Sequence, residues 1–213
     1  MINGDIKLKR KLTTTLSAFS WVCIVFGISI IAFTFFQWDL VEYLTPFLLF
    51  PSLLLLWIIF AILLLISLIC IPLQIRKISW KALLPLVVNG ITFLILYLVP
   101  FTSIRLDIEF KMNKKGYEEV IELVEDDKLQ PNEYGQAELP PEYRHLSKGP
   151  GEIMIDTSDG VTSVFFYTFL GLLDNFSGYM YRSNDTPPVQ DFMGGNWAEI
   201  TRKEPYWYFC ASY

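Results

Sequence analysis

The sequence predicts an integral membrane protein in which three transmembrane helices precede a small extracytoplasmic α+β domain, with one helix and an antiparallel sheet of about five strands. Two observations predict this fold class. AVILMFWYC residues make up 53% of the 213 residues and charged residues only 18%, with a mean hydropathy of +0.38. Such a chain is too apolar for an ordinary soluble domain. Three long apolar runs lie before residue 102, whereas most of the charge lies after it.

The three predicted spans are residues 13–36, 45–75 and 82–101, so residues 13–101 form the membrane region. At a rise of about 1.5 Å per residue, each run is long enough for a helix to cross a hydrocarbon core of about 30 Å. Helices are required because isolated strands would leave backbone groups unsatisfied in lipid. A signal peptide is the alternative for the first run, but the run exceeds the usual apolar length and lacks a clear small-x-small cleavage site. The sequence therefore favours an uncleaved span.

Basic residues predict the orientation of these spans, because short flanks rich in Lys and Arg stay in the cytoplasm. Residues 1–12 carry four basic residues, and the second loop carries three. The first loop has no basic residue and contains Asp39 and Glu42. The basic residues are Lys7, Lys9, Arg10 and Lys11, then Arg76, Lys77 and Lys81. We therefore expect a multi-pass protein of the cell membrane with a cytoplasmic N-terminus and an extracytoplasmic domain at residues 102–213.

Asn89 is the residue of the third span singled out for interhelical packing, since its amide can hydrogen bond to another helix. No Asp, Glu, Lys, Arg or His lies within the three predicted spans. Pumps and coupled transporters generally need ionisable groups at membrane depth. A transporter made from this chain alone is therefore disfavoured, whereas assembly of several copies into a homo-oligomer stays open.

Residues 102–213 carry nineteen acidic and ten basic residues, which disfavours nucleic acid as a partner. Alternating apolar residues predict a half-buried strand over Ser103–Lys111. Asn113 is a candidate cap for a following helix, whose apolar face would carry Tyr117, Val120, Ile121 and Val124. We expect that helix to fray near Lys128, because acidic residues at its C-terminal end oppose the helix dipole.

The remaining elements are predicted from turn signals. Residues 130–150, rich in proline and polar residues, indicate an extended connection. Strands at 152–156 and 161–170 form a hairpin through the Asp-Gly pair at 159–160, which suits positive φ angles. The chain then turns at 171–175, returns as a strand at 176–182, forms a loop at 183–188 and closes with a strand at 204–210.

No catalytic, metal-binding or cofactor-binding residue is predicted. His145 is the single histidine, which excludes sites that need two histidines, and we expect it at the surface. Cys23 and Cys70 fall in spans, so Cys210 is the only thiol of the outer domain and is expected in a buried strand. Turn chemistry accounts for four aspartates better than a Ca²⁺ site does, since no EF-hand spacing is present. These are Asp156, Asp159, Asp174 and Asp185. Sequons at Asn175 and Asn184 matter only in a eukaryotic secretory route.

The sequence thus favours a membrane-anchored binding or accessory protein, with the lipid bilayer and a protein at or in the membrane as its partners. Aromatic residues late in the chain form the candidate partner surface. They are Trp197, Tyr206, Trp207 and Tyr208. The alternative is an immunity-type factor, or a subunit of a larger membrane complex, that docks through its helices.

Overall fold

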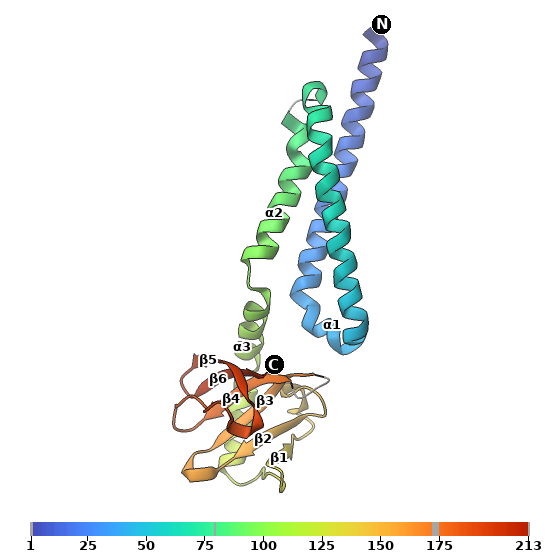
Figure 1. Ribbon diagram of the computed structural model, residues 1–213. Helices are drawn as coiled ribbons and strands as arrows, with labels where there is room; N and C mark the ends of the chain where they lie inside the picture. The colour runs from blue at the N-terminus through green and yellow to red at the C-terminus, as the bar shows by residue number, and fades with distance from the viewer. Residues whose placement is uncertain (1, 79, 172–174, 213) are drawn as a thin grey trace. The chain divides into compact units, whose positions relative to one another are not determined.

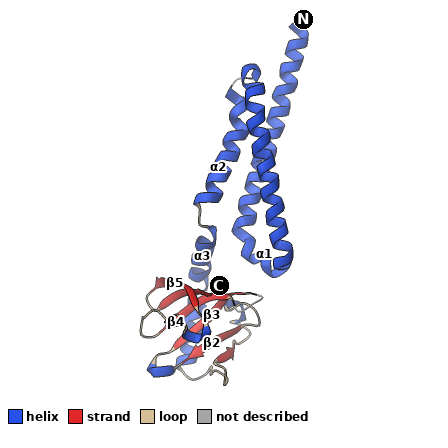
Figure 2. Cartoon of the chain, in the orientation of Figure 1, coloured by secondary structure: helices blue, strands red, loops and turns tan. Residues whose placement is uncertain are grey.

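The computed structural model describes residues 2–78, 80–171 and 175–212 of the chain, which falls into two compact units, Met1–Arg105 and Leu106–Tyr213. The first unit is helical, and all of the described strands belong to the second (Figures 1 and 2). Side chains described below exclude those of residues 1–6, 8–9, 41–43, 46, 70–81, 172–174 and 213. Cys70, Asp174 and the basic side chains of the predicted second loop therefore lie outside the described set.

The first unit begins with α1 (Ile2–Ile78), which is two helices joined at a break at Thr45. Thr45 has φ 57° and ψ 156° and precedes Pro46, and a residue before a proline disfavours helical geometry. Two stretches of α1 are long and apolar enough to cross a membrane, Arg10–Leu40 and Phe47–Ile69. They cover most of the first two predicted spans.

A short 3₁₀ helix η1 (Trp80–Leu83) leads into α2 (Leu84–Leu98), and α3 (Phe101–Glu125) follows. Val99 is extended and precedes Pro100, which interrupts the helix for the same steric reason as at Thr45. α2 has 15 residues and is bent by 60° relative to α3. The described residues thus give two candidate spans, and a third only if the bent pair α2 and α3 counts as one span.

Asn89 lies buried between α1 and α2. Its Nδ2 donates to Ser67 Oγ at 2.9 Å and approaches Cys23 Sγ at 3.6 Å, so this one amide reaches both halves of α1. Nearby, a Cβ added at Gly27 would lie 2.6 Å from Thr92 Oγ1, which shows how closely the helices approach there. Small and polar residues at the contact let helix backbones come together in lipid.

A second polar contact joins the start of α3 to the first half of α1 within the same unit. Arg105 Nε donates to Asp39 Oδ2 at 2.8 Å, and a second guanidinium nitrogen pairs with Oδ1 of the same carboxylate. Trp38 Nε1 donates to Thr102 Oγ1 at 3.0 Å. The two-point guanidinium contact fixes both distance and orientation, which a single ion pair would not.

Replacing Asn89 by leucine is expected to weaken the helix bundle by about 0.6 to 2 kcal/mol, because an interhelical hydrogen bond is lost while the branched shape of the side chain is kept. The Ser67 hydroxyl keeps its bond to Leu63 O, so no buried group is orphaned. Unfolding of the protein in bicelles measures the change. Ser29→Ala is the control, since that exposed hydroxyl binds only its own helix, at Val25 O. Equal effects of the two substitutions would show that the Asn89 amide does not stabilise the contact between the helices.

The second unit contains a six-stranded antiparallel sheet in the order β1-β2-β3-β4-β6-β5. The strands are β1 (Gln136–Glu138), β2 (Glu152–Asp156), β3 (Ser163–Leu170), β4 (Phe176–Arg182), β5 (Trp197–Glu204) and β6 (Trp207–Ser212). Short 3₁₀ turns η2 (Arg144–Leu146), η3 (Ser158–Gly160) and η4 (Phe192–Gly194) lie between them. α3 packs on one face of the sheet, and Tyr117 at its centre is fully buried there. A smaller apolar cluster around Phe165 and Trp197 occupies the other face.

The predicted strand at Ser103–Lys111 is wrong, because these residues belong to α3. Leu106 and Phe110 lie one helical turn apart and pack into the domain core, in line with Tyr117. Ile104 and Ile108 stay exposed on another face of the helix. The alternation of apolar residues therefore comes from two core positions of a helix, Leu106 and Phe110, and from two exposed isoleucines on another face of the same helix. Asn113 lies inside α3, so it is not an N-terminal cap.

Three predicted strands are confirmed in position: β2, β3 and β4, with the first two forming the expected hairpin. Asp159 and Gly160 in its turn have φ of 56° and 72°. The predicted number of about five strands is too low, since six are described. β1 falls inside the predicted connection at 130–150. The predicted closing strand at 204–210 is the junction of β5 and β6, which the chain makes by turning at 205–206.

Candidate functional site

The residues considered in the sequence analysis for catalysis or metal binding lie in several different elements of the structure. His145 is exposed in η2, and no three His, Cys, Asp or Glu side chains come together as a metal site among the residues the structure describes. Asp156 accepts hydrogen bonds from the backbone and hydroxyl of Ser158, and Asp159 has the positive φ of a turn residue. These two aspartates therefore hold turns.

The four aromatic residues predicted as a partner surface divide between core and surface. Trp197, Trp207 and Tyr208 are at most 4% exposed, so their rings stabilise the domain and leave little area for a partner. β6 alternates Trp207 and Phe209 toward α3 with Tyr208 and Cys210 toward the other face. Both faces of the strand are covered, which accounts for the burial. Tyr206, at 46% exposed, is the member of the set that a partner can reach.

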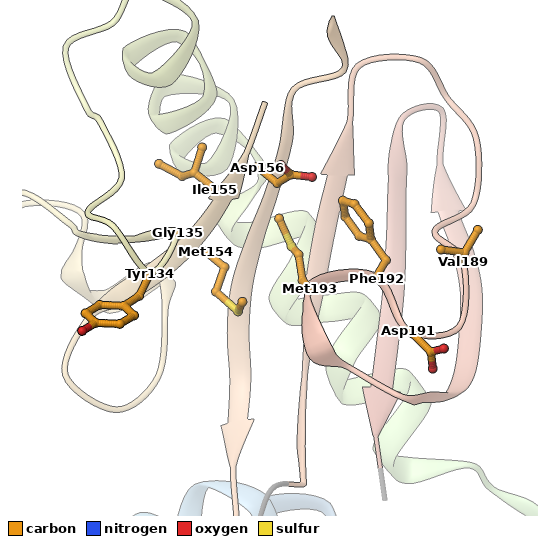
Figure 3. Close-up of a pocket in the computed structure, with 9 residues that line it drawn as sticks. All are labelled: Tyr134, Gly135, Met154, Ile155, Asp156, Val189, Asp191, Phe192 and Met193. Atoms are coloured by element: carbon orange, nitrogen blue, oxygen red, sulfur yellow. The ribbon is translucent and has the colours of Figure 1, made fainter. Parts of the chain in front are cut away.

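One groove of the domain, here the methionine groove, has a volume of about 480 Å³. Met154 of β2 forms one wall, and Phe192 and Met193 of η4 form the other, as the close-up in Figure 3 shows. Its remaining lining residues are Tyr134, Gly135, Ile155, Asp156, Val189 and Asp191. Methionine side chains adapt to irregular apolar partners. Asp156 and Asp191 are the two acidic residues of its lining.

A second groove, here the tyrosine groove, has a volume of about 430 Å³ and lies between α3 and the turn from β5 to β6. Its aromatic residues are Tyr181, Tyr206 and Trp207, with ring centroids 5.4 Å apart for Tyr181 and Trp207 and 6.2 Å for Tyr181 and Tyr206. The charged residues that line it are Glu118, Glu122, Glu204 and Lys114. Ile121 and Pro205 complete the lining.

Three carboxylates and one ammonium group thus line the tyrosine groove. Lys114 pairs with Glu204 and lies 3.8 Å from Glu118. The hydrogen bond to Glu204 is the main cause that raises the pKa of Lys114, so this amine stays charged. Glu122 has no ion pair among the described contacts, and the lining as a whole is negative. The groove combines aromatic faces with surplus negative charge.

The turn that carries Tyr206 has an unusual residue at its second central position. Pro205 and Tyr206 are the two residues between β5 and β6, and Tyr206 has φ 69°. Proline followed by a residue with positive φ is the pattern of a type II turn, whose second central position normally holds glycine or asparagine. A bulky residue there is strained by about 1 to 3 kcal/mol.

Asp185 holds this turn in place from the loop after β4. Its Oδ1 accepts from the backbone of Tyr206 at 2.7 Å, and its carbonyl accepts from the Tyr208 hydroxyl at 2.8 Å. It also pairs with Arg202. Arg182 N donates to the Tyr206 carbonyl at 2.8 Å, so both sides of the strained residue are tied to the loop and strand that precede it. Sequence reasoning placed Asp185 in a turn but missed this role.

Cys210 lies fully buried on the face of β6 that points away from α3. Burial raises the pKa of its thiol from 9.0 to about 12. A thiol that stays protonated is a poor nucleophile, so Cys210 is a core residue in this structure.

Comparison of the chain with known protein families, curated proteins and solved structures gave no match.

Substituting Asp185 by alanine is expected to destabilise the β5–β6 turn by about 1.5 to 3 kcal/mol, because a charged acceptor of a hydrogen bond is lost. Its φ of 52° adds to the cost, since alanine tolerates positive φ poorly. Asp185→Asn keeps an acceptor and tolerates this backbone, so we expect a smaller loss. Hydrogen exchange of β5 and β6 amides measures both. Unchanged exchange in Asp185→Ala would contradict the pinning role.

The Cys210 thiol is expected to resist iodoacetamide at pH 8 until the domain unfolds. The folded state keeps its thiol proton up to a higher pH than the unfolded state does. The contribution of the protonated Cys210 thiol to the free energy of unfolding is therefore complete below about pH 9, and it is lost as the pH rises toward about 12. Labelling in a Cys23→Ala, Cys70→Ala background, with and without urea, isolates this thiol. Rapid labelling of the folded protein would show that the strand opens readily.

Proposed function

We propose that this protein is a membrane-anchored binding or accessory protein, whose helices fix it in the bilayer while its α+β domain contacts a protein partner near the membrane surface. The observation that carries the proposal is the open, aromatic and acidic tyrosine groove on a folded domain that follows two apolar helices along the chain. Open grooves of this kind suit reversible contacts with a partner.

The proposal places the N-terminus in the cytoplasm and the domain outside it. Residues 1–12, before the first predicted span, carry four basic residues, and residues 102–213 carry nineteen acidic and ten basic residues. Retention of short basic flanks supports this orientation. The acidic domain would also be repelled by the anionic cytoplasmic leaflet.

Orientation is tested by labelling single cysteines with a membrane-impermeant maleimide. We expect Glu133→Cys to react in intact cells and Lys7→Cys only after lysis, in a background without native cysteines. The opposite pattern would place the domain in the cytoplasm and would contradict the extracytoplasmic part of the proposal.

Partner contact is tested by photo-crosslinking in cells, with a photoreactive residue at Tyr206 or Val189 in the domain and at Leu55 in the second half of α1. All three positions are exposed. We expect a discrete crosslinked protein from a domain position. A crosslinked protein only from Leu55 would instead support the alternative, docking through the helices.

A further inference from the structure

We propose that the tyrosine groove binds an arginine- or lysine-bearing segment of the partner protein, with the cationic group over the Tyr206 ring and beside the glutamates of α3. This inference rests on the proposed function, since it names the chemistry of the partner that the domain contacts. Four observations support it: the aromatic lining, the surplus negative charge, the repulsion built into α3 and the strained placement of Tyr206.

The aromatic lining supplies faces on which a guanidinium or ammonium group can lie. A cation within about 6 Å of a tyrosine or tryptophan ring is attracted by its negative face. Tyr181 and Trp207 are packed against the core, so they form the inner wall. Tyr206 has its ring at the surface, where an incoming side chain would meet it first.

The charged lining adds attraction that an apolar ligand would not use. Glu118 has a side chain 55% exposed, and Glu204 is 32% exposed. Lys114 offsets one of these negative charges, whereas Glu122 has no ion pair among the described contacts. Tyr181 donates to Glu125 at 3.4 Å, which extends the acidic surface one turn further along α3.

The glutamates of α3 also repel one another. Glu118 and Glu122 are four residues apart, so their side chains are neighbours on the helix and like charges there are unfavourable. A cationic segment bound between them would relieve this repulsion. Anionic partners such as nucleic acid or acidic lipid would increase it.

The occupant is a protein side chain and not a metal ion. Among the described residues no three acidic, histidine or cysteine side chains form a set that could hold an ion. A groove of about 430 Å³ instead matches an extended side chain with its neighbouring backbone.

Tyr206 occupies its position against the preference of its own turn. Glycine would remove the strain at φ 69°, and 46% of the area of Tyr206 is exposed, so that part of the side chain adds no buried area to the domain. Strain of this kind persists where the surrounding structure enforces it, often at binding sites. The arrangement therefore favours contact with a partner over stability of the domain.

The test compares peptide binding by the full-length protein in uncharged phosphatidylcholine nanodiscs. The probe is a fluorescent peptide of alternating arginine and glycine; a lysine version and a glutamine version accompany it. We expect the arginine and lysine peptides to bind, with affinity that falls as salt rises, and the glutamine peptide not to bind. Failure of the cationic peptides to bind would overturn the inference.

Variants then locate the site. Tyr206→Gly is expected to weaken binding by about twofold to thirtyfold, the range of one cation–π contact, while the thermal stability of the domain stays equal or rises. The pair Glu118→Gln and Glu122→Gln should weaken binding and flatten its salt dependence. Tyr134→Ala, an exposed tyrosine of the methionine groove, should bind as the unaltered protein does.

Two results would overturn the inference at this stage. Tyr206→Gly could bind as tightly as the unaltered protein, or it could lose thermal stability, which would make the ring structural. If cationic peptides fail while the cellular crosslink from Val189 persists, the groove assignment is wrong and the proposed binding function stands. If no crosslink forms from either domain position, the proposed function itself is wrong.

Discussion

The contact of one α3 stripe with the sheet organises the whole second unit. Tyr117 lies within 6 Å, centroid to centroid, of the rings of Phe166, Tyr179 and Trp207, and none of its own area is exposed. Because β6 must turn Trp207 toward this helix, the pleat sends Tyr208 to the opposite face. Tyr206 then falls in the turn, outside both faces. The exposed ring of the tyrosine groove is thus a consequence of the register that the core requires.

The same packing explains where sequence patterns succeeded and failed. The β2–β3 hairpin could be predicted because its signal is local: two apolar runs and a pair of turn residues at positive φ. The first turns of α3 could not, because Leu106 and Phe110 become core residues only when the sheet is present. Without that contact, four alternating apolar residues fit a strand as well as a helix. Burial against the sheet selects the helix, and an alternation over nine residues gives no information about that burial.

The candidate site was only partly visible in the sequence for a related reason. The aromatic cluster from Tyr206 to Phe209 includes two residues that line the tyrosine groove, Tyr206 and Trp207, but its four rings look equivalent in the sequence. Pro205 is the signal that could have divided them, since proline rarely lies inside a paired strand. The role of Asp185 depends on a contact with Tyr206 across 21 residues, which no local pattern encodes. The opposing charges of α3 and β5 likewise meet only in the folded domain.

Polar groups in the two units differ in how fully they are matched. Within the helical unit, Asn89 and Arg105 each have partners on another helical segment, as expected where an unmatched polar group is costly. In the tyrosine groove, water can screen Glu118 and Glu122, so their repulsion is tolerated without a partner. Glu122, which has no ion pair among the described contacts, and the strained, exposed ring of Tyr206 therefore both lie in a groove that is open to solvent. That location is also where a cationic segment could displace the water and use both features at once.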